Sequence, residues 1–206
     1  RRQRQMCIRD RIEKVGCETL LSNLDGIVVP GGFGPRGIEG MIKTAQYART
    51  NNIPYLGLCL GMQMMVIDVA RNVLGLESAN STEFEKDTNN PVICLMEEQK
   101  NVVNKGGTMR LGNYPCELNP DSYLNEIYGI SSIKERHRHR YEFNNSYLDD
   151  INKHGLIASG TNTKTGLVEA IELSDHPWYI GVQYHPEYKS LSLIHISEPT
   201  RRYAIS

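Results

Sequence analysis

Cys59 stands between two glycines, in the segment GLCLG of residues 57–61. A short apolar run, residues 53–56, precedes this segment, and an apolar, helix-like stretch, residues 62–67, follows it. At a sharp strand-to-helix turn both flanking positions require glycine, because a Cβ there would crowd the corner. Such a turn lifts the thiol above a sheet and places it at the start of a helix, where amide donors and the helix dipole favour thiolate over thiol. The pattern is typical of a nucleophilic cysteine.

A histidine and a glutamate near the other end of the chain supply a candidate base and its orienting group. His185 and Glu187 follow a strand-like apolar run, residues 178–182. Side chains alternate along a strand, so a His-x-Glu pair at its end would place imidazole and carboxylate on one face. Glu187 can then orient His185, and His185 can take the proton of Cys59. Either residue type alone is ordinary in a core or on a surface, but the three together indicate nucleophilic catalysis.

Alternating strand-like and helix-like segments predict an α/β fold, with an open, mostly parallel sheet and helices on both faces. The first half reads as strand 24–29, helix 41–50, strand 53–58 and helix 60–72. The later segments are a polar loop at 75–91, strands at 92–95, 108–111 and 114–118, a helix at 147–154, and strands at 156–159, 167–173 and 178–184. Reactive groups in such sheets gather at the carboxyl ends of the strands, and we expect Cys59 and His185 to meet there.

Both ends of the chain differ in character from the interior. Residues 1–11 and 191–206 are rich in arginine and resemble translated sequencing adapters, so we interpret them as non-native ends and residues 12–190 as one domain. Without the arginine-rich ends the interior is more acidic than the formal net charge of −1 of the whole chain.

The acidic interior argues against nucleic acid as a partner, since the only basic stretch is residues 134–140. The cysteines show no CxxC spacing, so the sequence indicates neither a zinc site nor a redox pair. The sequence shows no long apolar span and no signal peptide, so it does not indicate a membrane protein. We therefore expect a cytoplasmic domain in a reducing compartment.

With these residues in view, the chain resembles the class I glutamine amidotransferases, which hydrolyse the side-chain amide of glutamine and release ammonia. The resemblance rests on PGGFG (30–34), GLCLGMQ (57–63) and HPE (185–187). Within that family it is similar to the glutaminase half of the CTP synthases, through RGIEG (36–40), NSTEF (80–84), EEQKNVVNKGGTMRLG (97–112), RHRHRYEFNN (136–145) and GVQYHPE (181–187).

The resemblance implies a role for each matching residue. Cys59 would form a γ-glutamyl thioester with help from His185 and Glu187. The backbone N–H groups of Gly32 and Leu60 would form the oxyanion hole. The glutamine-binding residues would be Phe33, Gln63, Glu83 and Arg140.

Taken alone, several of these residues have plainer interpretations. Gln63 could be a polar helix residue and Glu83 a solvated surface group, while residues 136–140 could form a solvated basic strand or a phosphate site. His137 and His139 receive no role.

The resemblance also implies partners beyond this domain. L-glutamine would be its substrate, with no metal or cofactor in the domain itself. An N-terminal amidoligase domain would use ATP, Mg and UTP, GTP would act as activator, and the full-length protein would be a homotetramer. Residues 105–110 resemble the family's lid loop, which is linked to GTP activation. Two alternatives stay open: a free-standing γ-glutamyl hydrolase of the same fold, and a non-catalytic scaffold domain.

Overall fold

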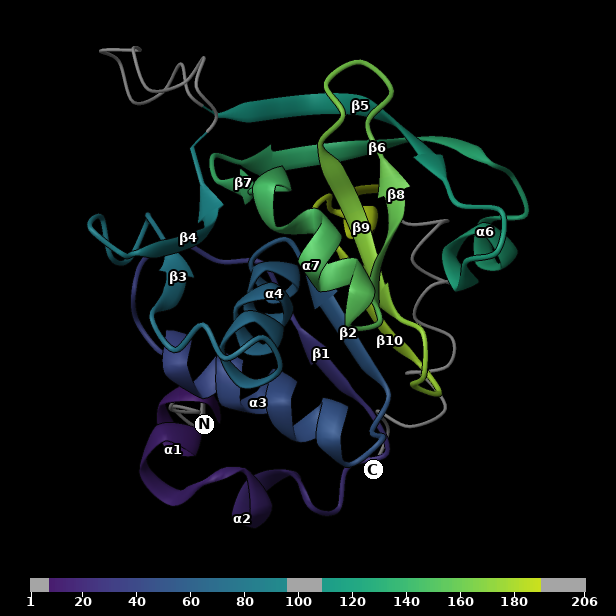
Figure 1. The fold of residues 1–206 in the computed structure, drawn as a ribbon. Coiled ribbons are helices and arrows are strands. Elements are labelled where there is room, and N and C mark those ends of the chain that lie inside the picture. Colours follow the sequence, from purple (N-terminus) through teal and green to yellow (C-terminus); the bar gives the residue numbers. More distant parts are fainter. Residues whose placement is uncertain (1–7, 96–108, 190–206) are drawn as a thin grey trace, which may run out of the picture.

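The computed structural model describes residues 8–95 and 109–189, and these form an α/β fold around a seven-stranded sheet (Figure 1). In spatial order the strands are β1 (Ile27–Val29), β2 (Tyr55–Leu58), β10 (Tyr179–Val182), β9 (Val168–Leu173), β8 (Leu156–Thr161), β5 (Arg110–Leu118) and β6 (Ser132–His139). A smaller sheet contains β3 (Ala79–Ser81), β4 (Asn90–Cys94) and β7 (Glu142–Phe143).

The large sheet is mixed, so the α/β class is confirmed while its parallel part is smaller than the sequence suggested. Strands β1, β2 and β10 are parallel, whereas β9, β8, β5 and β6 join through antiparallel pairs. In the parallel part Leu58 pairs with Val182. The chain leaves both strands at the same edge, and this brings the residues after β2 beside those after β10.

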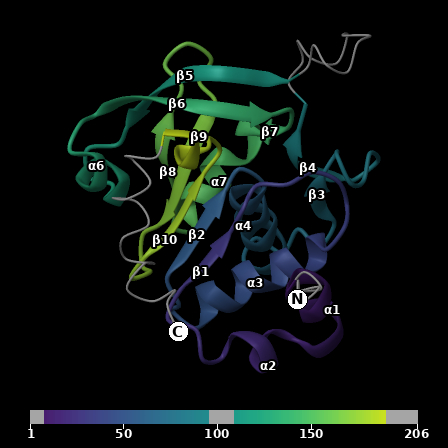
Figure 2. The same cartoon turned by 180° about the vertical axis from the view of Figure 1, so that it is seen from behind.

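Helices cover both faces of the parallel strands. Helices α3 (Ile38–Thr50) and α4 (Leu60–Asn72) share one core with β1, and α1 (Ile8–Val15) and α2 (Cys17–Leu21) lie outside α3. On the opposite face α6 (Tyr123–Tyr128) packs through Leu124 on side chains of β2 and β10. Figure 2 shows the hairpin of β5 and β6 at the end of the molecule away from α1 and α2. A last helix, α7 (Leu148–Lys153), lies beside β8.

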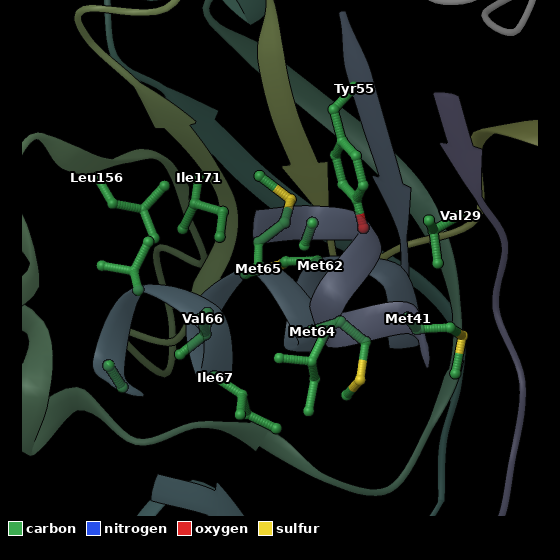
Figure 3. Packing of buried hydrophobic residues seen from close by; sticks show 14 of the residues in the cluster. Val29, Met41, Tyr55, Met62, Met64, Met65, Val66, Ile67, Leu156 and Ile171 are labelled. Carbon is green, nitrogen blue, oxygen red and sulfur yellow. The ribbon is translucent and has the colours of Figure 1, made fainter. Parts of the chain in front are cut away.

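Helix α4 is the centre of the core, and every residue from Leu60 to Ala70 is buried. Its methionines lie between Ile171 on one side and Met41 on the other (Figure 3). The two glycines around Cys59 make this close packing possible. A Cβ on Gly57 would lie 2.6 Å from the backbone of Gly61, and a Cβ on Gly61 would lie 2.1 Å from the carbonyl oxygen of Val29. The requirement for glycine at both flanks is therefore confirmed.

Several elements differ from the sequence-based expectation. Strand β3 lies inside the stretch expected to be loop, and α6 was not expected. Strand β5 continues through Gly112, where two strands had been expected, because Gly112 takes a φ of +102° that only glycine adopts readily. Helix α6 begins at a Ser122 cap, whose side chain accepts from the N–H of Asn125, and ends at Gly129.

The expected ends and lid lie largely outside the described residues. Helix α1 begins at Ile8, four residues before the domain boundary expected at 12, and the assignment of both ends as non-native stays a prediction. Of the lid-like segment 105–110, residues 105–108 lie outside the described part, and Arg110 begins β5. No helix within residues 8–95 and 109–189 is long and apolar enough to cross a membrane.

Candidate active site

Cys59 occupies a strained corner between β2 and α4. Its backbone has φ 51° and ψ −100°, one of two non-glycine residues with positive φ in the described chain. Its N–H donates to the carbonyl of Val182 over 2.7 Å, and its carbonyl accepts from the N–H of Gln63 over 3.2 Å. Positive φ costs a non-glycine residue roughly 1–3 kcal/mol and persists where the surroundings fix it, often at active sites. The corner thus holds the thiol in one orientation.

The thiol of Cys59 is protonated in the resting protein. Burial raises its pKa to about 12, the N–H of Leu60 lowers it by donating to the sulfur, and the carboxylates of Glu142, Glu187 and Glu83 raise it further. The amide donor at the start of α4 acts on the sulfur as expected, but the loss of hydration outweighs it in the resting state. A base must remove the proton during any reaction of the sulfur.

His185 and Glu187 form the expected pair. The Nδ1 atom of His185 lies 2.6 Å from Oε1 of Glu187. Because a carboxylate accepts, Nδ1 donates this bond and Nε2 keeps its lone pair. Nε2 is buried and has no hydrogen-bond partner within residues 8–95 and 109–189. The pair forms for a different reason than expected: β10 ends at Val182, and a 3₁₀ turn (Pro186–Lys189), not strand alternation, brings the carboxylate back to the ring.

Gly31 marks the point where the thiol and the imidazole meet. A Cβ built on Gly31 would lie 2.8 Å from Cε1 and 3.6 Å from Nε2 of His185, and 3.4 Å from Cβ of Cys59. Cys59, His185 and Glu187 also line a single cavity of about 280 Å³. The structure therefore brings together the three residues that the sequence predicted, with a glycine between two of them.

A second, smaller pocket borders Cys59 and is lined by the other residues predicted for the site. Its lining includes Cys59 and all six of Gly32, Phe33, Leu60, Gln63, Glu83 and Arg140, together with Met109, His139 and Tyr141. Glu83 accepts a hydrogen bond from the N–H of Gly34 over 3.0 Å, which fixes its carboxylate at the pocket wall. Phe33 is 58 % exposed and lies at the rim. The pocket is thus rimmed by an aromatic ring and carries charges of both signs.

A buried ionic cluster behind the pocket was not expected. The guanidinium of Arg110 lies 2.7 Å from a carboxylate oxygen of Glu169 and 3.1 Å from one of Glu142. His137 and His139 contact each other over 2.7 Å between Nδ1 and Nε2. Burial raises the pKa of Glu142 to about 8 and lowers the pKa of His137 to about 2 and of His139 to about 3.

Strand β6 explains why both histidines are buried. Buried and exposed residues alternate along it, so Arg136 and Arg138 face outward and the histidines face inward. The interpretation of 136–140 as a solvated basic strand therefore holds only for alternate residues, which face opposite ways as the period of two predicts. Within residues 8–95 and 109–189, no group of three or more His, Cys, Asp and Glu side chains could hold a metal ion.

Comparison with known proteins decides the family. The family model for "Glutamine amidotransferase class-I" matches residues 7–193. The chain belongs to the class I glutamine amidotransferase family. This amidotransferase domain is also similar to the glutaminase domain of Trypanosoma brucei CTPS with bound acivicin, at 37% identity and a TM-score of 0.83, over 94% of this chain and 78% of that one. This similarity agrees with the motifs of the CTP synthase glutaminase half that the sequence contains.

Curated relatives of this amidotransferase domain are longer proteins. It is 61% identical over 170 residues to the CTP synthase of Christiangramia forsetii and 62% identical over 173 residues to that of Flavobacterium psychrophilum. These matches cover 82% and 84% of the chain but 31% and 32% of the relatives, so the chain spans about a third of their length. A glutamine amidotransferase of Thermotoga maritima, 14% identical with a TM-score of 0.52, shares the fold alone.

Proposed function

We propose that this domain hydrolyses L-glutamine through Cys59, His185 and Glu187. The observation that carries the proposal is the convergence of a fixed thiol and an imidazole with an unoccupied Nε2 lone pair around Gly31. Among the residues that the structure describes, none donates to that lone pair, so His185 can accept the thiol proton when a substrate carbonyl is presented to the sulfur. Because burial raises the pKa of the thiol, His185 must take its proton before or during attack on the carbonyl.

The second pocket suits the polar ends of free glutamine. Glu83 would bind the α-amino group and Arg140 the α-carboxylate, since each offers the opposite charge. The side-chain amide would then point toward Cys59, which lines both cavities. The N–H of Leu60 already reaches the sulfur, and with the N–H of Gly32 it would stabilise the oxyanion.

The reaction would proceed through two half-reactions. Cys59 attacks the amide carbon, His185 takes its proton and returns it to the departing nitrogen, and ammonia leaves behind a γ-glutamyl thioester. Water then attacks the thioester with His185 as base, releasing glutamate and the thiol. Glu187 stabilises the charged imidazole in both half-reactions through its 2.6 Å contact.

Labelling with a glutamine-mimicking diazoketone tests this proposal. We expect one covalent adduct, mapped by mass spectrometry to Cys59 and suppressed by excess glutamine, together with release of glutamate from free glutamine. Cys116 provides the matched control, because it is also a buried free thiol but lies outside both cavities. A Cys116→Ala variant should label and turn over as the parent does. Absence of an adduct on Cys59 in folded protein would support the scaffold alternative, and preference for γ-glutamyl peptides over glutamine would support the hydrolase alternative.

We further infer that this domain supplies ammonia within a longer CTP synthase. Its relatives are CTP synthases, and about two-thirds of their length lies outside the matched region; both facts support that view. An N-terminal amidoligase domain would use ATP and Mg to aminate UTP to CTP, with GTP as activator, in a cytoplasmic homotetramer. The chain alone should release ammonia from glutamine but form no CTP from UTP and ATP; formation of CTP by the chain alone would contradict the inference.

A further inference from the structure

Gln183 contacts the sulfur of Cys59, and no role was predicted for it from the sequence. It follows β10 and is completely buried. Its backbone N–H donates to the carbonyl of Glu169 over 2.8 Å, which anchors it to β9. Its side-chain Nε2 donates to Sγ of Cys59 over 3.6 Å, within the range of hydrogen bonds to sulfur.

Neighbouring groups fix the orientation of the Gln183 amide. The Nε2 atom of Gln63 lies 3.1 Å from the backbone carbonyl of Tyr141, which can only accept a hydrogen bond. The same nitrogen lies 3.2 Å from Oε1 of Gln183, so the oxygen of Gln183 must face Gln63. Its NH₂ group must therefore face the sulfur. If the amide of Gln183 were flipped, its nitrogen would face the side-chain nitrogen of Gln63, and its oxygen would face the sulfur of Cys59.

We infer that Gln183 is a positioning residue that holds the sulfur of Cys59 by an N–H donor and links it, through Gln63, to the pocket segment at Tyr141. The inference rests on the proposed glutamine hydrolysis for its effect on turnover, but the contact to sulfur is independent of it. A hydrogen bond to an ionised acceptor is about twice as strong as one to a neutral acceptor. The amide therefore stabilises the thiolate more than the thiol.

This role matters because the other surroundings of the sulfur oppose ionisation. Burial and three nearby carboxylates all disfavour the thiolate, and the N–H of Leu60 lowers the pKa of Cys59 too little to offset them. The N–H of Leu60 must also serve a developing oxyanion if it acts as proposed. Gln183 is completely buried and lines neither of the two cavities at Cys59, so it can stay in contact with the sulfur throughout the reaction.

The test measures the reactivity of Cys59 in the absence of glutamine. Parent, Gln183→Met and Gln183→Glu proteins are treated with iodoacetamide across a pH range, and the Cys59 peptide is quantified by mass spectrometry. Methionine keeps the length of the side chain without a donor, and glutamate keeps its shape but replaces the donor by an acceptor. We expect the alkylation pKa to rise by about one unit in Gln183→Met, hence about tenfold slower labelling at neutral pH, and by more in Gln183→Glu. In turnover, kcat should fall about tenfold with little change in KM.

Thr44→Val serves as a control for the loss of a buried hydrogen bond far from the site. The hydroxyl of Thr44 donates to the carbonyl of Gly40 within α3, so its removal should leave the alkylation profile unchanged. Unchanged profiles in both folded Gln183 variants would overturn the inference, as would an increase in KM with kcat intact. If Gln183→Met does not fold, the Gln183→Glu profile decides. If the parent protein fails to hydrolyse glutamine while the alkylation shift is present, the proposed function fails and the role of Gln183 at the sulfur holds.

Discussion

Replacing Gly31 by alanine should lower the activity of this domain and leave its stability almost unchanged. The new Cβ would lie 2.8 Å from Cε1 of His185, whereas carbon atoms pack at about 3.5–4.0 Å. The imidazole or the turn at residues 30–32 must therefore move by roughly 0.7 Å or more. Either movement disturbs the reaction, because the first separates the base from Cys59 and the second displaces the N–H of Gly32.

The expected magnitude follows from the size of that displacement. A misplacement of about 1 Å in a reacting group can cost on the order of 10²-fold in rate, or about 2.7 kcal/mol of barrier. We expect kcat for glutamate release to fall by about this factor in Gly31→Ala. The melting temperature should change little, because His185 borders a cavity and has room to move.

Gly160→Ala is the matched control, because it creates an equally close contact away from the site. Its Cβ would lie 2.7 Å from Sγ of Cys116 and 3.1 Å from Cβ of Ala170, inside the core. Overpacking of this kind costs about 1–3 kcal/mol, so the variant should lose stability in urea and keep its kcat. A Gly31→Ala protein with the kcat of the parent would refute the reasoning, since it would mean that the rate does not depend on the positions of His185 and of the turn at residues 30–32.

Three further perturbations follow from the same geometry. Cys59→Ala should abolish glutamate release while calorimetry still detects glutamine binding, because the pocket keeps its charged groups; residual turnover near the parent rate would contradict this. Arg110→Met should destabilise the fold by about 3–5 kcal/mol in urea unfolding, because it leaves two buried carboxylates without their cation; a loss below about 1 kcal/mol would disagree. His137 and His139 stay neutral in the folded state and protonate near pH 6.5 when unfolded, so folding stability should fall as pH drops below 6.5, by about 2 kcal/mol per histidine at pH 5. The double variant His137→Gln/His139→Gln should flatten that dependence in urea titrations at pH 5 and 7.5, and equal slopes in variant and parent would argue against it.

The sequence was most informative where one residue type alone satisfies the geometry. The glycines of residues 57–61 predicted the strand-to-helix corner, because a Cβ at either flank would overlap backbone atoms. The carboxyl-edge rule for parallel strands then placed Cys59 near His185 with no knowledge of the intervening chain. Residues of the second pocket, Glu83 and Arg140 among them, were found only through resemblance, since isolated charged residues in loops carry no local signal.

Features that depend on contacts distant in sequence could not be predicted. The mixed sheet could not be predicted, because short apolar strands have similar sequences whether their neighbours are parallel or antiparallel. The pKa of Cys59 depends on how completely the sulfur is buried and on carboxylates that the chain brings in from three other segments. The role of Gln183 could not be predicted either, because the residues that its side chain contacts, Gln63 and Cys59, lie more than a hundred residues away in the sequence.

The strain at Cys59 explains why the helix that follows it is buried on all sides. The backbone strain of Cys59, with φ 51°, would relax if α4 could shift along its axis. Packing around α4 must therefore oppose that shift. Gly181 of β10 allows that packing: a Cβ there would lie 2.6 Å from Sδ of Met65 and 3.0 Å from Cγ of Met62. The same strand leads directly into Gln183 and His185. The glycine that lets α4 pack closely thus lies on β10, and the side chains that contact or serve the sulfur follow directly after it, so a shift of β10 against α4 would disturb the nucleophile, its hydrogen-bond donor and its base together.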